Sequence, residues 1–346
     1  MRSRKSNDRV TIKAVAAQAG VSAMTVSNVV NRTGKASAAT RARVLKVIDE
    51  LGYVPSQAAR RLVGSDSARI GLIYPEGESG FVNAAIVGAS VTAARRGLQL
   101  LLRGVEWRAP GAALQGASGL VRSGADALVL ISPFAEALSG SPGLASLSVP
   151  AVAVATAQPL PDMDAVRIDN HAAAYQVTSL LIARGHRRIG VIAGPPTHSD
   201  SVARLEGHKA ALRDHGIVPD AALCADGDFT FASGLAAAET LLRTAERPTA
   251  IVAANDDMAA AALWSARRLG LHPPGDLAVT GFDDTLVATR VWPALTTVRQ
   301  PIEAMIDKAF EMLLDRLRSD SSSEVMRDIV FEAALVERDS VARNIA

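Results

Sequence analysis

The chain has 346 residues, of which 21% are charged, and its 37 Lys and Arg barely outnumber its 35 Asp and Glu. This length is more than one compact core usually occupies and fits a small domain followed by two larger ones. The single cysteine, Cys224, excludes a disulfide framework or a thiolate metal site within one chain.

The near-neutral total hides a division of charge along the chain. Residues 1–64 hold twelve Lys and Arg but three Asp and Glu, a net charge of +9, and the remainder carries −7. A basic first segment favours a phosphate-bearing partner, and an acidic body does not. The first ten residues lack the apolar segment of a signal peptide. No apolar run approaches the ~18 residues of a membrane span, so we expect a soluble, cytoplasmic protein without a membrane partner.

Residues 11–31, TIKAVAAQAGVSAMTVSNVVN, have the pattern of two short helices joined by a tight turn. An apolar stripe at helical spacing begins after Thr11, a suitable N-cap, and ends at Gly20, a suitable stop. Ser22 is the expected N-cap of the second helix, whose valines would pack on the first. The other face of the second helix is mostly polar and free of acids: Met24, Ser27, Asn28 and Asn31. This pattern predicts a helix-turn-helix with the second helix as the recognition helix.

A third helix and a short basic segment follow. Ser37 is the expected cap of the third helix, and Gly52 is its expected end. Residues 55–63 begin with proline and span about two turns, fewer than the dozen or so residues that an isolated helix needs in water. They fit either a plain linker or, as the family resemblance given below favours, a hinge helix that orders only when DNA and the partner subunit's copy are present.

From residue 68 onward, apolar runs alternate with amphipathic helices such as Phe81–Arg96, His171–Arg184, Phe231–Thr244 and Asp256–Leu269. Apolar runs separated by helices predict parallel sheets covered on both faces. Eight such strands favour two doubly wound lobes with a cleft between them. The expected strands are Ile70–Tyr74, Leu98–Leu102, Ala127–Ile131, Ala151–Ala155, Ile189–Ala193, Ala222–Ala225, Ala250–Ala253 and Leu277–Gly281.

The helix-turn-helix and the following SAATRARVLKVIDELGYVPSQAARRL resemble the DNA-binding headpiece of the LacI family of transcriptional regulators. RIDNHAAAYQVTSLLIARGHRRIGVIAGP, RLEGHKAAL, ANDDMAAAAL, LAVTGFDD and WPALTTVRQP follow in that family's usual order. The resemblance implies an α/β protein with a small all-α headpiece, residues 1–64, which includes a hinge helix near 55–63. Two doubly wound parallel-sheet lobes would follow: 65–166 with 297–324, and 167–296 with 325–346.

The resemblance also implies a function. It predicts a repressor that binds a pseudo-palindromic double-stranded DNA operator as a homodimer and is controlled allosterically by a small-molecule effector. The final residues, ERDSVARNIA, contain no heptad run, so we expect no tetramer. The expected DNA contacts are Thr11, Ser22, Ala23, Met24, Thr25, Ser27, Asn28, Asn31, Ser37, Thr40, Tyr53, Ala59 and Leu62.

One position of the recognition helix departs from the family's common TVSR motif, because this chain reads Thr25-Val26-Ser27-Asn28. An asparagine amide matches adenine N7 and N6, whereas arginine matches guanine O6 and N7. We therefore predict an A·T pair opposite Asn28; the alternative is a phosphate contact. By resemblance, Leu62 would wedge into the central minor-groove step.

The effector is expected at the carboxyl ends of the strands, where open α/β sheets bind ligands. Asn255 and Asp283 each follow a strand, Arg204 is expected before a helix, and Phe229 and Phe81 are expected in loops. Arginine and short polar acceptors can hold vicinal hydroxyls, and a flat ring covers an apolar face. The resemblance implies effector contacts at Arg204, Asn255, Asp283 and Phe229, with Phe81 and Asp169 as further positions. The alternatives are helix caps for Asp and Asn and core packing for Phe.

A sugar or glycoside is the expected effector, although one position departs from the sugar-binding pattern. Many sugar-responsive members carry a carboxylate near the end of the fourth strand, where this chain has Ala155 and Thr156. A purine or nucleobase stacked between Phe81 and Phe229, acting as a corepressor, is the alternative.

An enzyme of nucleotide or sugar metabolism is a remote alternative. The chain contains no GxGxxG, GxxxxGK[ST], GxSxG or CxxC motif, so we expect no catalytic residue, no cofactor and no metal. In the pairs Asp256-Asp257 and Asp283-Asp284, one member is expected to cap the following helix. His186, in ARGHRR, is expected on the surface.

Overall fold

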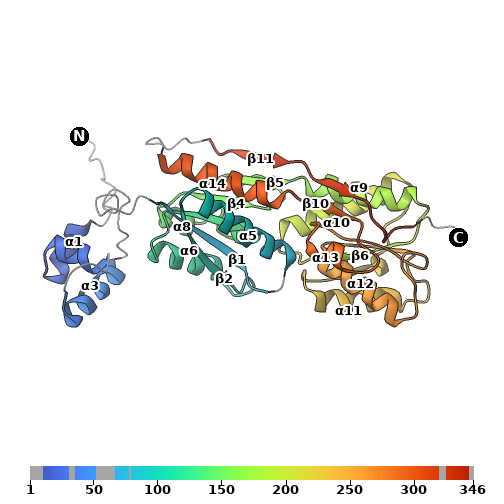
Figure 1. Cartoon of the computed structure of the whole chain (residues 1–346), viewed down its shortest axis with the longest axis horizontal. Coiled ribbons are helices and arrows are strands. Elements are labelled where there is room, and N and C mark those ends of the chain that lie inside the picture. Colours follow the sequence, from blue (N-terminus) through green and yellow to red (C-terminus); the bar gives the residue numbers. More distant parts are fainter. Residues whose placement is uncertain (1–10, 31–35, 52–66, 78, 319–324, 343–346) are drawn as a thin grey trace.

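The computed structural model describes residues 11–30, 36–51, 67–77, 79–318 and 325–342. Its first three helices are α1 (Ile12–Ala19), α2 (Ala23–Val30) and α3 (Ala38–Leu51), and they form a compact unit of their own, which we call the headpiece (Figure 1). The expected hinge segment, residues 55–63, lies outside the described residues.

Local capping explains the headpiece boundaries. The Thr11 hydroxyl accepts a hydrogen bond from the Ala14 amide, and α1 ends at Gly20, whose φ of 63° is the left-handed value that glycine adopts at low cost. The Ser22 and Ser37 hydroxyls accept hydrogen bonds from the amides of Thr25 and Thr40. The predicted helix-turn-helix and its caps are confirmed.

The first lobe is built on a six-stranded sheet in the order β11-β5-β4-β3-β1-β2, and all of its neighbouring strands are parallel. Successive residues of its strands face opposite sides, so Val129 packs toward α5 and α14 while Leu130 packs toward α6 and α7. The elements of this lobe are β1 (Arg69–Pro75), α5 (Gly80–Arg95), β2 (Gln99–Val105), α6 (Ala112–Arg122), β3 (Ala127–Ile131), α7 (Phe134–Leu138), α8 (Pro142–Leu147), β4 (Ala151–Val154), β5 (Asp164–Ile168), α14 (Ile302–Arg318) and β11 (Asp328–Phe331).

The second lobe has a four-stranded parallel sheet in the order β7-β6-β8-β9. Helices α9 and α10 cover one face and α11 and α12 cover the other, which confirms the doubly wound arrangement. Its elements are α9 (Asn170–Ala183), β6 (Ile189–Ala193), α10 (Ser199–Asp214), η1 (Ala221–Leu223), β7 (Cys224–Asp226), α11 (Phe231–Leu242), β8 (Ala250–Ala253), α12 (Asp256–Arg268), β9 (Ala278–Thr280) and α13 (Leu286–Arg290).

The chain crosses between the lobes three times. It passes from β5 into α9, returns through β10 (Thr297–Arg299) into α14, and runs from β11 back to β12 (Ala334–Val336), which pairs antiparallel with β10. Strand β11 pairs with β5 in the first sheet, although the expected division placed residues 325–346 with the second lobe. The crossing strands are short, which explains why apolar run length did not reveal β10, β11 and β12.

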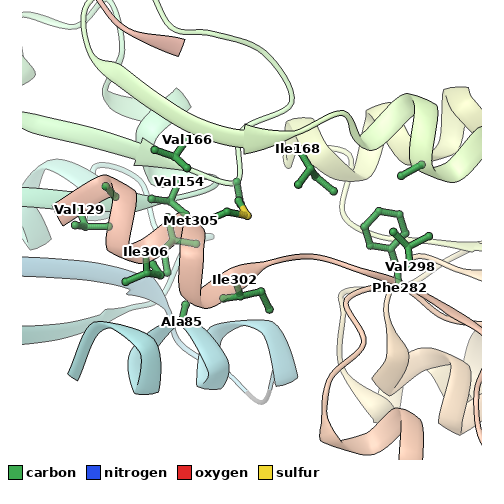
Figure 2. Packing of buried hydrophobic residues seen from close by; sticks show 14 of the residues in the cluster. Ala85, Val129, Val154, Val166, Ile168, Phe282, Val298, Ile302, Met305 and Ile306 are labelled. Atoms are coloured by element: carbon green, nitrogen blue, oxygen red, sulfur yellow. The ribbon is translucent and has the colours of Figure 1, made fainter. Parts of the chain in front are cut away.

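A continuous apolar core follows α14 from the first lobe toward the second (Figure 2). Met305 and Ile306 lie against Val129 and Val154 of the first sheet. Phe282 and Val298 continue the same cluster at the junction of the lobes, together with Ile302. Because one buried cluster serves both lobes, a change in their relative position must repack it.

Candidate DNA-binding face and effector cavity

Exposed groups suited to DNA lie at the starts of α2 and α3 in the headpiece. Met24 is 70% exposed, and neither helix has an acidic residue in its first turn. Ser22 and Thr25 share a 2.9 Å hydroxyl hydrogen bond, and Ser37 and Thr40 share another of 2.9 Å. Helix N-termini with exposed hydroxyls and no carboxylate are suited to phosphate.

The other expected DNA contacts are placed as follows. Thr11 caps α1, and Ala23, Ser27 and Asn28 lie on α2, where all three side chains are half-buried. Asn31, Tyr53, Ala59 and Leu62 fall outside the described residues.

A cavity of about 270 Å³ lies between the two lobes. Both lobes contribute to its wall, as expected for a cleft at the carboxyl ends of parallel strands. The first lobe supplies Pro75, Glu76, Gly77, Ser79, Phe81, Val82, Glu106, Trp107, Arg108, Ile131, Ser132 and Ala155, and the second supplies His198, Asp200, Arg204, Asp228, Phe229, Thr230, Asn255 and Asp283.

Arg204 is the most firmly held polar group of this cavity. It lies within α10, not before a helix as expected, and is 6% exposed. Its Nε donates to Asn170 Oδ1 at 2.8 Å and its Nη1 donates to the Ala254 carbonyl at 2.7 Å. Nη2 lies 3.2 Å from Asp200 Oδ2, and Nη1 lies 3.7 Å from Asp283 Oδ1. Because its geometry is fixed before any ligand arrives, Arg204 loses little side-chain entropy on binding.

Asp283 lies beside Arg204 at the end of the segment that follows β9. It is buried, has a φ of 106°, and accepts a 2.7 Å hydrogen bond from Gln300 Nε2. Burial raises the pKa of Asp283 well above its usual value, against the opposing charge of Arg204. A backbone held in this region at a ligand-facing carboxyl is typical of a functional site.

Asn255 both caps a helix and lines the cavity, the two roles that were expected as alternatives. Its Oδ1 accepts from the Met258 amide at 2.9 Å and so caps α12, and the residue also lines the cavity. Its Nδ2 donates to the Phe229 carbonyl at 2.8 Å, which ties the Phe229 loop to the helix start. Phe229, with a φ of 69°, lies in the expected loop and lines the cavity.

The other two candidates differ from expectation. Phe81 lines the cavity, but it is the second residue of α5 and not part of a loop. Asp169 is exposed and caps α9 through the Ala172 amide at 2.9 Å, and it is not among the cavity-lining residues.

A row of three rings forms one wall of the cavity and was not anticipated from the sequence. Trp107 and His198 meet edge-to-face with ring centroids 4.7 Å apart, and His198 and Phe229 follow at 5.6 Å. Trp107 comes from the first lobe, whereas the other two come from the second. Strand β2 ends at Val105, three residues later than expected, so the correct boundary would have placed Trp107 at a strand's carboxyl end.

Burial lowers the pKa of His198, and the positive charges of Arg204 and Arg108 act in the same direction while Asp200 opposes them. The imidazole is therefore neutral at pH 7 and can donate or accept a hydrogen bond. Trp107, His198 and Asp200 are functional candidates that strand-end reasoning missed.

The acidic pairs do not cap helices as predicted, because Asn255 is the N-cap of α12 and Thr285 is that of α13. Asp256 instead accepts from the Thr285 amide at 2.7 Å and from Thr297 Oγ1 at 2.6 Å, and burial raises its pKa to about 6. Asp257 accepts from the Gly80 amide at 2.9 Å, across the two lobes. Among the described residues no group of three or more metal-ligating side chains gathers.

The expectation that His186 lies on the surface is wrong, because this residue is buried. Its Nδ1 lies 3.0 Å from Thr249 Oγ1, and burial lowers its pKa. Within the part of the chain that the structure describes, no helix is long and apolar enough to cross a membrane.

Known proteins are similar to this chain both in the headpiece and in the two lobes. A model of bacterial regulatory proteins of the lacI family matches residues 11–56, and one of a periplasmic binding protein-like domain matches residues 178–341. The chain is 36% identical to the HTH-type transcriptional regulator CelR of Thermobifida fusca over 96% of this chain and 98% of that protein. It is 35% identical to the HTH-type transcriptional repressor PurR of Edwardsiella ictaluri over 96% and 97%.

Two solved structures share the whole architecture. A complex of the transcriptional regulator CelR with cellobiose has a TM-score of 0.71 at 33% identity, over 96% of this chain and all of that one. The Lac repressor dimer bound to operator and the anti-inducer ONPF has a TM-score of 0.72 at 27% identity, over 97% of this chain and all of that one.

Proposed function

The chain belongs to the lacI family of bacterial regulatory proteins, and from this premise we propose that a sugar bound between its lobes controls how tightly its headpiece binds DNA. The family makes it a DNA-binding transcriptional repressor. We take the headpiece as the operator-binding part and the two lobes as the effector-binding part. It acts in the cytoplasm as a homodimer, by binding and without catalysis.

The cavity around Arg204 is the observation that carries the proposal. A guanidinium held by Asn170 and Ala254 lies among Asp283, Asn255 and the Phe229 ring, where it can bind adjacent hydroxyls while the ring covers an apolar sugar face. The similar regulator whose structure was solved as a complex with cellobiose supports a sugar over a purine. The buried cap at Asn255 and the short segment at Asp283 hold these groups on rigid elements.

Control of DNA binding follows from the position of the cavity. Because the lobes line it together, a ligand that binds one lobe arrangement better shifts the population toward that arrangement. In a dimer this shift changes the spacing of the two headpieces, and two half-sites at a fixed separation are then matched or mismatched. The coupling is reciprocal, so operator DNA must change sugar affinity by the same factor.

Two measurements on the full-length protein test the proposal. Thermal shift against a panel of sugars and purines should show a dose-dependent rise in melting temperature with a sugar. Fluorescence anisotropy with operator DNA, selected from a random pool, should then show that the same sugar changes the dissociation constant.

Measured where circular dichroism shows the variant to be folded, Arg204→Ala should abolish the sugar response and leave operator binding intact. Arg213→Ala, on the exposed side of the same helix, should behave like the parent. A response to purines alone, or an unchanged response in Arg204→Ala, would overturn the assignment.

A further inference from the structure

Two chemically different groups of residues line the cavity. The first group is Arg204, Asn255 and Asp283, which the proposed function already uses for one sugar ring. The second group is Trp107, which comes from the loop after β2 of the first lobe, and His198 of the second lobe, whose ring Trp107 meets. The proposed function assigns no part of the ligand to this second group.

The Trp107 ring is held in place by its neighbours. The Arg108 guanidinium lies 4.1 Å from the ring centroid, and Arg108 Nη2 donates to Asp228 Oδ2 of the second lobe at 3.1 Å. The Arg108 amide donates to Glu106 Oε1 at 3.1 Å, which stabilises the turn of this loop. A ring fixed from both lobes is a preorganised surface for a ligand and costs little entropy when the ligand binds.

The three rings contact one another in turn along the cavity lining, Phe229 with His198 and His198 with Trp107. Phe229 lies within reach of Arg204, whose guanidinium carbon is 5.9 Å from the Phe229 centroid, so a ring bound to Arg204 lies at the Phe229 end. Trp107 lies two steps further along, of 5.6 Å and 4.7 Å between centroids. A sugar ring held by Arg204 against Phe229 uses a different ring of the lining from Trp107, and a second ring linked to the first is what would use Trp107.

The charges of the lining select against anions. Carboxylates outnumber guanidiniums around the cavity, so a phosphate or a uronate would meet repulsion over most of the wall. The carboxylates counted are Glu76, Glu106, Asp200 and Asp228, and the guanidiniums are Arg108 and Arg204. Asp283 is left out because burial raises its pKa well above its usual value. Although burial acts to raise it, the pKa of Asp228 is lowered by hydrogen bonds from Thr230, Ser233 and Arg108, so this carboxylate is charged.

We propose that Trp107 and His198 form a second subsite, which takes the second ring of an uncharged disaccharide whose first ring is held at Arg204. This inference rests on the proposed function and adds the size and charge of the effector. The indole covers an apolar face of the second ring, and the neutral imidazole of His198 offers a hydrogen bond to one of its hydroxyls. Trp107 is thus the residue that distinguishes a disaccharide from a monosaccharide.

Calorimetric titration of the full-length protein with glucose, cellobiose and maltose tests the subsite. We expect at least one disaccharide to bind about tenfold or more tightly than glucose. Trp107→Ala should bring that disaccharide down to the affinity of glucose, while Trp107→Phe should retain most of the preference because it keeps a ring. The control is Trp292→Ala, since Trp292 is 78% exposed and does not line the cavity.

The outcomes separate the two proposals. If glucose and both disaccharides fail to bind the parent, the sugar assignment and the subsite fall together. If a disaccharide has no advantage over glucose, or if Trp107→Ala weakens both ligands equally, the subsite alone is wrong. Glucose 6-phosphate should bind at least about tenfold more weakly than glucose, and tighter binding of the phosphate would overturn the charge argument.

Discussion

The headpiece and the two-lobed core hold their polar recognition groups in opposite ways. In the headpiece these groups are hydroxyls at helix starts, such as Ser22 and Ser37, on the water-facing side of a small core. In the core they are buried and already paired, as Arg204 is with Asn170 and Asp200. Among the described residues of the headpiece, the apolar side chains that are buried are all valine or alanine (Val15, Ala16, Ala19, Val26, Val29, Val44 and Val47), whereas the large lobes bury Phe134, Phe282 and Phe310.

This difference predicts how substitutions divide between binding and stability. An exposed side chain on the headpiece can be changed with little effect on folding, because water replaces its partners. A buried polar side chain of the cavity, such as Arg204, cannot be changed with so little effect, because its removal leaves buried polar groups unpaired. The four predictions that follow test this division.

Arg204→Ala should have the largest effect on stability. It leaves Asp200 and Asp283 buried near each other without their shared cation, and removing one partner of a buried pair typically costs about 3–5 kcal/mol. Asp283 can take up a proton, so the cost should be smaller at pH 6 than at pH 8. Chemical denaturation of the core at the two pH values measures both effects, and a loss below about 1 kcal/mol at pH 8 would contradict the prediction.

Acid should destabilise the core through His208 and leave the headpiece untouched by this route, because all six histidines lie after residue 170. Burial lowers the pKa of His208 from 6.5 to about 4. The unfolded chain therefore binds a proton between these values that the folded chain does not, and stability falls as the pH falls from 6.5 toward 4, by up to about 3 kcal/mol.

A variant isolates this effect from that of the other histidines. Thr178 Oγ1 donates to the Ala174 carbonyl at 2.8 Å and so accepts from His208 Nδ1 at 3.1 Å, a hydrogen bond that an asparagine amide can retain. His208→Asn should reduce the loss of stability on going from pH 7 to pH 5, measured by denaturation. An unchanged pH slope would show that His208 does not contribute.

Asn28→Arg should change operator preference with a much smaller effect on stability than Arg204→Ala. Asn28 lies on α2 and is half-buried, and we predict that it reads an A·T pair. Arginine there should shift the selected base toward guanine by about 1–3 kcal/mol at one symmetric pair of positions, as seen by selection from random operators. An unchanged base preference with altered affinity would mean that residue 28 contacts phosphate.

The helix boundaries of the headpiece could be predicted from the sequence because local chemistry decides them. The caps at Thr11, Ser22 and Ser37 and the stop at Gly20 follow from hydrogen bonding and backbone conformation over three or four residues. The cavity residues Asn255 and Asp283 were found because each follows a buried apolar strand, and that position is itself a local signal.

Contacts between residues that lie far apart in the chain could not be predicted from the sequence. Trp107 and His198 are 91 residues apart in the chain and belong to different lobes, so their rings meet only because the two lobes pack together. Asp169 precedes a helix just as Asn255 does, but its strand, β5, ends where the chain leaves the first lobe, so Asp169 caps α9 away from the cavity. Local sequence therefore predicts a cap in both cases, and only the topology decides which of them faces the ligand.

The smallest effect is expected from removing a helix cap, and two caps can be compared, one in the headpiece and one in the two-lobed core. The Ser22 hydroxyl accepts from the Thr25 amide at 3.1 Å in the headpiece, and the Ser141 hydroxyl accepts from the Leu144 amide at 3.3 Å in the core. Replacing either serine by alanine should cost about 1 kcal/mol of local stability, measured by hydrogen exchange at the capped amides. Only Ser22→Ala should weaken operator binding, because the start of α2 is both a cap and part of the expected DNA-binding face. If Ser141→Ala weakens operator binding as much, cap loss alone explains the effect, and Ser22 does not contact DNA.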